Sequence, residues 1–356
     1  MHIITCEQVS SGHPDKICDQ IADAVVTDCL RNDPNSRVAI EVLIKDYHIV
    51  IAGELTSTHT PDYAELVDSV FDSIGKDSLG YDPGKCELEI LVSRQSPDIA
   101  QGVDVGGAGD QGMMFGWASN ETIELLPLPF VLAGKLLAKL EEARKEKPGF
   151  LCADAKAQVS FDYDSGKIKT FLCSTQTIPG AKPADVKKLV SKLMKEVALE
   201  YALNTDFKIL VNPTGKFEIG GPFADSGVTG RKLACDTYGG VGHIGGGAMS
   251  GKDPTKVDRS GAYITRKIAR DIVTAGYADK CEVQIAYAIG VAEPVSIHVE
   301  TFGTEHQDVS FIEAYVRENY DLTPKGIIDG LDLRNVDYTR ISHGGHFGKA
   351  GLPWEE

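Results

Sequence analysis

The segment from Arg231 to Arg259 carries residue types suited to binding a highly charged ligand. It holds five basic residues and three aspartates, so its balance is +2 in a chain whose net charge is −16. Seven of the thirteen residues from 239 to 251 are glycine, and glycine lets a backbone approach a ligand closely. An exposed loop with internal salt bridges would explain the charges but not the glycines. The pattern therefore indicates a polyanion site.

Two lysines of this segment, Lys252 and Lys256, are four residues apart and would share one face of a helix. Neighbouring lysines repel one another unless an anion lies between them. Asp253 and Asp258 interrupt the positive charge, and carboxylates are ligands that Mg²⁺ prefers. Gly246 begins a run close to a phosphate-binding loop, but Asp253 replaces the hydroxyl residue that such a loop needs. We therefore expect phosphate binding without the P-loop fold.

A second candidate site lies at the start of the first predicted helix, in the run Gly12-His13-Pro14-Asp15-Lys16. Proline suits the first helical position, which makes His13 the expected N-cap. A helix N-terminus offers free N–H groups and partial positive charge, and His13 and Lys16 would add donors for an anion. The alternative is that His13 only caps the helix and Asp15 only complements its dipole.

Four charged residues lie on predicted strands. Lys156 follows Asp154 on a strand whose other face is apolar, and Glu41 and Glu54 each interrupt an apolar strand. Each of these side chains is either solvated or a ligand. Together with the cations above, they indicate a polyphosphate bound with Mg²⁺, of which a nucleotide is the commonest kind. These residues by themselves do not name the reaction.

The elements that must position these residues recur three times in the order helix, strand, strand, helix, strand. Helices are predicted from apolar residues at three- and four-residue spacing, and strands from alternation. The first pass covers 14–32, 38–44, 49–55, 61–74 and 86–92. The second pass covers 130–147, 157–161, 168–172, 183–197 and 207–211. The third pass covers 259–272, 283–287, 295–299, 311–318 and, as its weakest strand, 338–341.

This repeat predicts an α+β fold of three similar α/β domains related by a pseudo-threefold axis. Strands joined by short turns predict mostly antiparallel sheets, with the helices on the outer face. The expected domains are 1–100, 101–218 and 219–356, with some segments exchanged between them. A sheet with helices on one side needs a cover for its other face, so an oligomer is expected.

Composition excludes several classes of protein. Apolar residues make up 42 % of the 356 residues and charged residues 25 %, which is typical of a globular protein. The charge of −16 argues against a nucleic-acid or membrane partner. No secretion signal or apolar stretch of about 20 residues is found. The eight cysteines show no CxxC spacing, so we expect reduced thiols in a cytoplasmic protein.

The chain closely resembles the S-adenosylmethionine synthetase family (methionine adenosyltransferases). The resemblance rests on motifs that follow one another over nearly the whole chain. They are Gly12-His-Pro-Asp-Lys16, Gln95-Ser-Pro-Asp-Ile99, Gly107-Ala-Gly-Asp-Gln-Gly112, Asp154-Ala-Lys156, Asn212-Pro-Thr-Gly215, Gly220-Gly-Pro222, Thr229-Gly-Arg-Lys232, Asp236-Thr-Tyr-Gly-Gly240, Gly245-Gly-Gly-Ala248, Ser250-Gly-Lys-Asp-Pro254 and Lys256-Val-Asp-Arg259. As a set these motifs are highly specific.

The resemblance implies a fold of three α/β domains about a pseudo-threefold axis, in agreement with the repeat. It implies homodimers that pair by sheet faces with active sites between subunits, sometimes as dimers of dimers. The implied reaction joins ATP and L-methionine into S-adenosylmethionine by sulfur attack on C5′, followed by hydrolysis of triphosphate to pyrophosphate and phosphate. Mg²⁺, as two ions, and K⁺ are the implied cofactors.

The resemblance also implies a role for each candidate residue. His13 would donate a hydrogen bond to the oxygen that leaves C5′. The cations that would hold the triphosphate are Lys156, Arg231, Lys232, Lys252 and Lys256. The other residues implied at the nucleotide are Asp154, Lys216, Phe217 and Ala248. Methionine would meet Glu54, Gln95, Asp110, Asp225 and Lys256. The metal ligands would be Asp15 and Asp258 for Mg²⁺ and Glu41 for K⁺.

Two other functions use the same residues. A Mg²⁺-dependent hydrolase of triphosphate or nucleotides would need only the lysines and the metal. A non-catalytic nucleotide-binding subunit would be expected to lack His13, Lys156 or Asp258, and all three are present. The loop between Gln101 and Gly112 is shorter than in many members of the family, so the behaviour of this loop as a lid is open.

Overall fold

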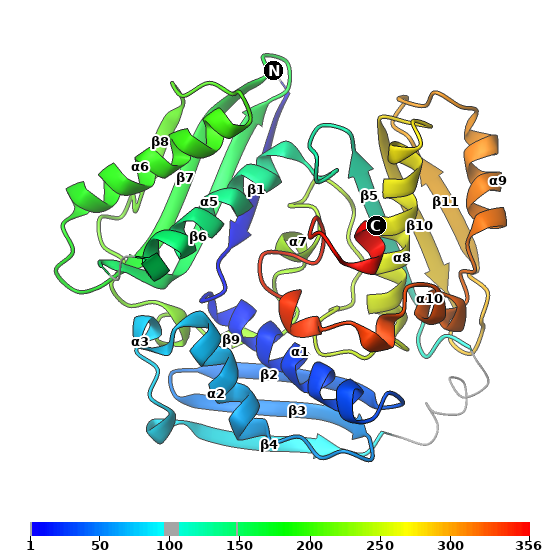
Figure 1. Ribbon diagram of the computed structural model, residues 1–356, viewed down its shortest axis with the longest axis horizontal. Coiled ribbons are helices and arrows are strands. Elements are labelled where there is room, and N and C mark those ends of the chain that lie inside the picture. The colour runs from blue at the N-terminus through cyan, green and yellow to red at the C-terminus, as the bar shows by residue number, and fades with distance from the viewer. Residues whose placement is uncertain (1, 96–106, 147–148) are drawn as a thin grey trace.

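The computed structural model describes residues 2–95, 107–146 and 149–356. Its strands form three separate sheets, each covered by helices, and the three units surround a common centre (Figure 1). Residues 96–99 of the motif that begins at Gln95, and residues 101–106 of the loop from 101 to 112, lie outside the described residues. Among the helices that are described, none combines the length and hydropathy needed to cross a membrane.

The first unit contains the helix that begins at the predicted proline. Its elements are α1 (Pro14–Asn32), β2 (Arg37–Lys45), β3 (His48–Thr56), α2 (Tyr63–Ile74), α3 (Lys76–Leu79) and β4 (Glu87–Ser93). The strand order is β4-β3-β2-β9, where β9 is the short strand Gly227–Val228. The buried residues of β2 alternate, Val38, Ile40, Val42 and Ile44, and pack beneath α1. The opposite face of this strand is open.

The second unit repeats this arrangement. Its elements are α5 (Leu128–Glu146), β6 (Leu151–Asp162), β7 (Lys167–Thr177), α6 (Pro183–Glu200) and β8 (Lys208–Val211). The sheet has the order β1-β6-β7-β8 and begins with the first strand of the chain, β1 (Ile3–Val9). Apolar residues of α5 and α6 form one core with the inner faces of β6 and β7.

The third unit contains α8 (Val257–Thr274), β10 (Lys280–Tyr287), β11 (Ser296–Glu300), α9 (Val309–Asn319) and α10 (Pro324–Gly330). Its sheet, β11-β10-β5, takes its third strand, β5 (Gly112–Ser119), from much earlier in the chain. The strand predicted at 338–341 is wrong, because Tyr338–Arg340 form a 3-10 turn capped by Asp337. The hydroxyl of Tyr338 is buried and donates to the Leu333 carbonyl 2.6 Å away.

The three units therefore exchange strands. Strand β1 pairs antiparallel with β6, β5 pairs antiparallel with β10, and β9 pairs antiparallel with β2. The sheets are mostly antiparallel, as predicted; the parallel pairs are β3 with β4 and β7 with β8. The division of the chain after residues 100 and 218 stays a prediction, because the sheets share strands across it.

The helices that open the three passes, α1, α5 and α8, face the middle of the molecule, where the C-terminal segment also runs (Figure 1). Trp354 and Tyr263 are fully buried there and stack with ring centroids 3.7 Å apart. The N-terminus of α1, which carries the predicted His13 site, lies next to the second unit, since Ser10 donates its backbone N–H to the Ala155 carbonyl of β6. The first turn of α1 is thus positioned by contacts with the first and the second unit.

Candidate active site

His13 caps α1 as predicted. Its Nδ1 accepts a hydrogen bond of 3.2 Å from the Asp15 backbone N–H. Burial, helped by the charges of Lys232 and Lys156, lowers the pKa of His13 to about 3. The imidazole is therefore neutral at physiological pH, and since Nδ1 accepts, Nε2 carries the proton and is a hydrogen-bond donor. A neutral donor suits an oxygen on which negative charge develops.

Asp15 pairs with two of the cations near His13. Its Oδ2 lies 2.5 Å from Lys232 Nζ, and its Oδ1 lies 3.6 Å from Arg231 Nε and accepts from the Val228 N–H at 2.9 Å. Burial alone would raise the pKa of Asp15, but the Lys232 ammonium and the Val228 N–H hold it below its usual range. The carboxylate is therefore ionised and available to a cation.

Lys156 and Asp154 lie on β6 beside this turn. Lys156 is on the exposed face of the strand, and its charge acts on the His13 ring, as does that of Asp225. Asp154 is buried, and its Oδ2 accepts from the Gly221 N–H at 2.8 Å. Burial raises the pKa of Asp154 to about 6 against the effects of Gly221 and Lys156. We call the set of His13, Asp15, Lys156, Asp225, Arg231 and Lys232 the His13 group.

A second set of predicted residues lines a cavity of about 230 Å³ next to β2 and the start of α8. Within it, Lys252 Nζ lies 2.6 Å from Asp258 Oδ2, and Lys256 pairs with the buried Asp253. The side chains of both lysines are about one-fifth exposed. We call the predicted residues that line this cavity the Lys256 group: Glu54, Gln95, Asp110, Lys252, Lys256 and Asp258.

Glu41 and Ala248 line an adjoining cavity of about 320 Å³, which shares Glu54 and Lys252 with the first. The structure places Lys216 and Phe217 in neither group. Lys216 is largely exposed with its Nζ 3.9 Å from Glu218, and the Phe217 carbonyl accepts from the Thr177 N–H. The structure therefore gathers most of the predicted residues into two groups, with Glu41 and Ala248 beside the second group and Lys216 and Phe217 in neither.

Comparison with known proteins identifies the family. Three domain patterns of S-adenosylmethionine synthetase match consecutive parts of the chain: the N-terminal domain at residues 1–97, the central domain at 105–217 and the C-terminal domain at 219–356. The chain belongs to the S-adenosylmethionine synthetase family. The S-adenosylmethionine synthases of Mycoplasma capricolum and Mycoplasma mycoides are each 46 % identical to it, over 99 % of this chain and 94 % of theirs. That of Mesoplasma florum is also 46 % identical, over 99 % and 97 %.

Membership in the S-adenosylmethionine synthetase family confirms the resemblance, the three-domain fold and the class of enzyme expected from the sequence. The chain is a methionine adenosyltransferase, and S-adenosylmethionine synthesis is its function. The two other functions, a triphosphate hydrolase and a non-catalytic nucleotide-binding subunit, are not favoured. The family implies ATP and methionine as substrates and a requirement for a divalent metal and K⁺.

Each carboxylate predicted as a metal ligand could provide one protein ligand to such an ion. Among residues 2–95, 107–146 and 149–356, no cluster of three His, Cys, Asp or Glu side chains forms a metal site. Mg²⁺ at phosphate sites needs only one or two protein carboxylates, because phosphate oxygens and water complete its shell. Gly247 leaves room for one such carboxylate, since a Cβ there would come within 2.3 Å of both Asp258 carboxylate oxygens. Asp15 and Asp258 each lie among cations, where a polyphosphate would also bind.

The structure adds two carboxylates that sequence reasoning missed. Asp15, Asp19 and Asp23 lie one turn apart on α1, and each is buried. Each accepts a backbone N–H at 2.9 Å, from Val228, Gly230 and Gly251 respectively. Asp19 also pairs with Lys16, and Asp23 pairs with Arg259. We call these three carboxylates the aspartate ladder.

The aspartate ladder attaches both basic loops to one helix. It holds the segment that carries Arg231 and Lys232 at the start of α1, and the segment that carries Lys252 two turns later. Two turns correspond to about 12 Å along a helix. The signal was present in the sequence, because aspartates at i, i+4 and i+8 lie on one face of a helix and need partners when that face is buried.

Proposed function

We propose that the His13 group and the Lys256 group are two halves of one catalytic site, which is completed when two copies of the chain pair. Three observations support this. The aspartate ladder keeps the halves about two helical turns apart within one chain. Glu54 of the second half and Glu41 of the adjoining cavity lie on the open face of the β2–β3 pair, by their registers with Ala39 and Ala52. Leu43 on that face is 44 % exposed and Leu91 of β4 is 55 % exposed.

In this site the sulfur of methionine attacks C5′ of ATP, the C5′–O bond breaks, and triphosphate leaves. The sulfur needs no general base, so the protein accelerates the step by alignment and by stabilising the charge of the leaving group. His13 Nε2–H donates to the oxygen that leaves C5′. The observation that carries this proposal is the neutral His13 ring, whose Nδ1 accepts from the Asp15 N–H and which feels the charges of Lys232 and Lys156.

The triphosphate is held by cations from both halves, Lys156, Arg231, Lys232, Lys252 and Lys256. Asp15 and Asp258 would each hold one Mg²⁺, Glu41 would hold K⁺, and when bound these ions offset phosphate charge. The same cations keep the triphosphate in place while water cleaves it to pyrophosphate and phosphate. Lys232 is now paired with the buried Asp15, and Lys252 is paired with Asp258, which is one-fifth exposed. A phosphate can replace Asp258 as the partner of Lys252.

Carboxylates and an amide would recognise methionine, whose ammonium group attracts acids. We assign this role to Glu54, Gln95, Asp110 and Asp225, with Lys256 on the carboxylate. Asp154, Lys216, Phe217 and Ala248 would contact the nucleotide. All eight cysteines are free thiols, which supports placing the protein in a reducing compartment, the cytoplasm.

The activity is tested by incubating the protein with ATP, methionine and Mg²⁺, with and without K⁺, and measuring S-adenosylmethionine by mass spectrometry. We expect a product that requires methionine and increases with K⁺. Release of phosphate from added triphosphate with no alkylated methionine would instead identify a hydrolase.

The shared site is tested by mixing two variants, His13→Asn and Lys256→Ala, during coexpression. If each site takes one half from each chain, a mixed dimer keeps one intact site, and random pairing restores roughly a quarter of the wild-type activity. If both halves serve the same chain, every site keeps one defect and mixing restores nothing. Each variant expressed alone is the matched control.

A further inference from the structure

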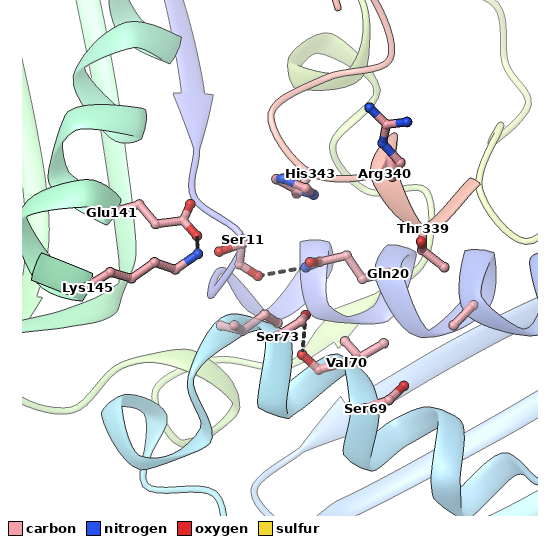
Figure 2. Close-up of a pocket in the computed structure, with 12 residues that line it drawn as sticks. Ser11, Gln20, Ser69, Val70, Ser73, Glu141, Lys145, Thr339, Arg340 and His343 are labelled. Carbon is pink, nitrogen blue, oxygen red and sulfur yellow. Dashed lines mark hydrogen bonds and ion pairs between the residues drawn. The ribbon is translucent and has the colours of Figure 1, made fainter. Parts of the chain in front are cut away.

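A further cavity, of about 560 Å³, lies between the three units, and Figure 2 shows the side chains that line it. It is formed by α1 and α2 of the first unit, α5 of the second and the C-terminal segment near residue 340, so all three units contribute to it. None of the residues assigned above to ATP, methionine or metal is among the described residues that line this cavity. Its volume is in the range of small-molecule sites.

The lining of this cavity is polar and basic. Arg340 and Lys145 bring positive charge, and Glu141, 2.6 Å from Lys145, is the one acid among the described residues of the lining. Within the part of the chain that the structure describes, the Arg340 guanidinium has no ion pair. Hydroxyl groups from Ser11, Ser69, Ser73 and Thr339 lie around the same space, and those of Ser69 and Ser73 already donate to the carbonyls of Leu66 and Val70. Guanidinium, ammonium and hydroxyl groups together are the donors that recognise oxyanions.

His343 provides a further polar atom on the side of Arg340. Its Nδ1 is buried and has no hydrogen-bond partner in the described structure. Lys349 holds the segment that carries both residues. Its Nζ donates to the carbonyls of Arg340, Ile341 and His343, at 3.2, 2.8 and 2.5 Å respectively. Because His343 also lines the cavity, a rotation of its ring would bring this unsatisfied nitrogen to a bound ligand.

We propose that this cavity binds a small metabolite through an oxyanion group, phosphate or carboxylate, held by Arg340, Lys145 and His343. The ligand is linked to the catalytic turn through Gln20, which lines the cavity. Gln20 Nε2 donates to the carbonyls of Ser11 and Lys16, both at 2.8 Å, on either side of His13. A ligand that draws Gln20 toward itself loosens this turn, so binding changes the rate of the reaction. The coupling, unlike the binding, rests on the proposed function.

The binding is tested by calorimetry on the full chain with three probes: 3-phosphoglycerate, glycerol 3-phosphate and glycerate. 3-Phosphoglycerate carries a phosphate and a carboxylate, glycerol 3-phosphate carries only the phosphate, and glycerate carries only the carboxylate. Comparing the three affinities therefore shows which group is recognised. We expect saturable binding to the wild type and to Lys256→Ala, and at least tenfold weaker binding to Arg340→Gln and Lys145→Gln. Arg334→Gln, a surface arginine bonded to Pro34 and Asn35, is the matched control and should bind normally.

Two results would overturn the binding proposal. One is the absence of saturable binding by all three probes at millimolar concentration. The other is binding that survives in Arg340→Gln but is lost in Lys256→Ala, because that would place the probe in the catalytic site. Thermal unfolding of each variant verifies that it is folded.

The coupling is tested by measuring kcat for S-adenosylmethionine formation with the best probe added. We expect a shift in kcat in the wild type and none in Arg340→Gln, whose kcat without probe should equal that of the wild type. An equal shift in both proteins would contradict the coupling. If the chain makes no S-adenosylmethionine at all, the proposed function fails while the binding result stands independently.

Discussion

The buried ion pairs of α1 and those at the rim of the proposed catalytic site use the same groups but differ in exposure. Lys16 lies 2.9 Å from Asp19, and both side chains are at most 1 % exposed. Lys252 lies 2.6 Å from Asp258, and these side chains are 23 % and 20 % exposed. The distances are similar, so distance alone does not separate the two regions.

Exposure decides what each kind of pair can do. Separating a buried pair leaves an uncompensated charge, which costs about 3–5 kcal/mol, so the buried pairs hold one arrangement. An exposed pair contributes at most about 1 kcal/mol, because water can replace either partner. We therefore expect the buried pairs to position the basic loops, and the rim pairs to keep cations ready for the triphosphate of the proposed site.

The largest effect is expected from Arg259→Met, which leaves Asp23 buried without its cation. We expect a loss of about 3–5 kcal/mol in the free energy of unfolding, measured by denaturant titration. Lys252→Ala, at the rim, is the matched control and should lose less than about 1 kcal/mol. Equal losses would show that burial does not distinguish the two regions. If Arg259→Met does not fold, the double variant with Asp23→Leu should restore part of the stability, because it removes the unpaired charge.

His13→Asn should affect the reaction rather than the fold. Asparagine is a good N-cap, so α1 keeps its first turn, but the imidazole donor is lost. We expect the alkylation step in single-turnover experiments to slow by about 10²–10³-fold, with ATP binding nearly unchanged. His306→Asn, on the surface beside Asp279, is the control. An equal loss of ATP binding and rate would remove His13 from the role of donor to the leaving group.

Asp154 gives a prediction about pH. Its pKa of about 6 in the folded protein is above the value of about 3.9 expected in the unfolded chain, so the folded state takes up the proton first. Stability contributed by this proton is present below pH 4 and is lost as the pH rises through 6. Relative to Asp154→Asn, the wild type should gain about 2 kcal/mol between pH 7 and pH 4. Denaturant titrations at four pH values measure this, and a difference that does not change with pH would contradict the buried carboxyl.

The smallest effect on stability is expected from a substitution in the rim pair of Lys252 and Asp258. Lys252→Ala removes one cation from the triphosphate site but leaves Asp258 in contact with solvent. We expect triphosphate binding to weaken about tenfold, with a fall in turnover, while the unfolding free energy stays close to that of the wild type. Binding is measured by calorimetry with triphosphate and Mg²⁺. Unchanged binding and turnover would make Lys252 an ordinary solvated side chain.

Local residue patterns were enough to predict most elements of the fold. The apolar spacing after Pro14 predicts α1, and the alternation from Val38 to Ile44 predicts β2 and its buried face; both are confirmed. His13 was expected to cap the helix, and it does.

The strand expected at 338–341 was wrong because so short a run does not distinguish a strand from a turn. Only Tyr338 and Ile341 are apolar within these four residues. The turn is fixed by its Asp337 cap and by a contact with α1, since the Tyr338 backbone N–H donates to the Thr27 hydroxyl at 3.1 Å. That contact joins positions 311 residues apart, so the local pattern could not reveal it.

The sequence by itself determined the element types, the family and the residue types available for catalysis, because helix and strand periodicity and motif spacing are local properties. The tertiary structure decided which of those residues meet. Lys232 reaches Asp15 across 217 positions, and β1 joins the sheet of the second unit rather than its own. Such contacts depend on how distant segments close upon one another, which no local pattern records. The same long-range packing buried the aspartate ladder and separated most of the predicted site residues into two groups.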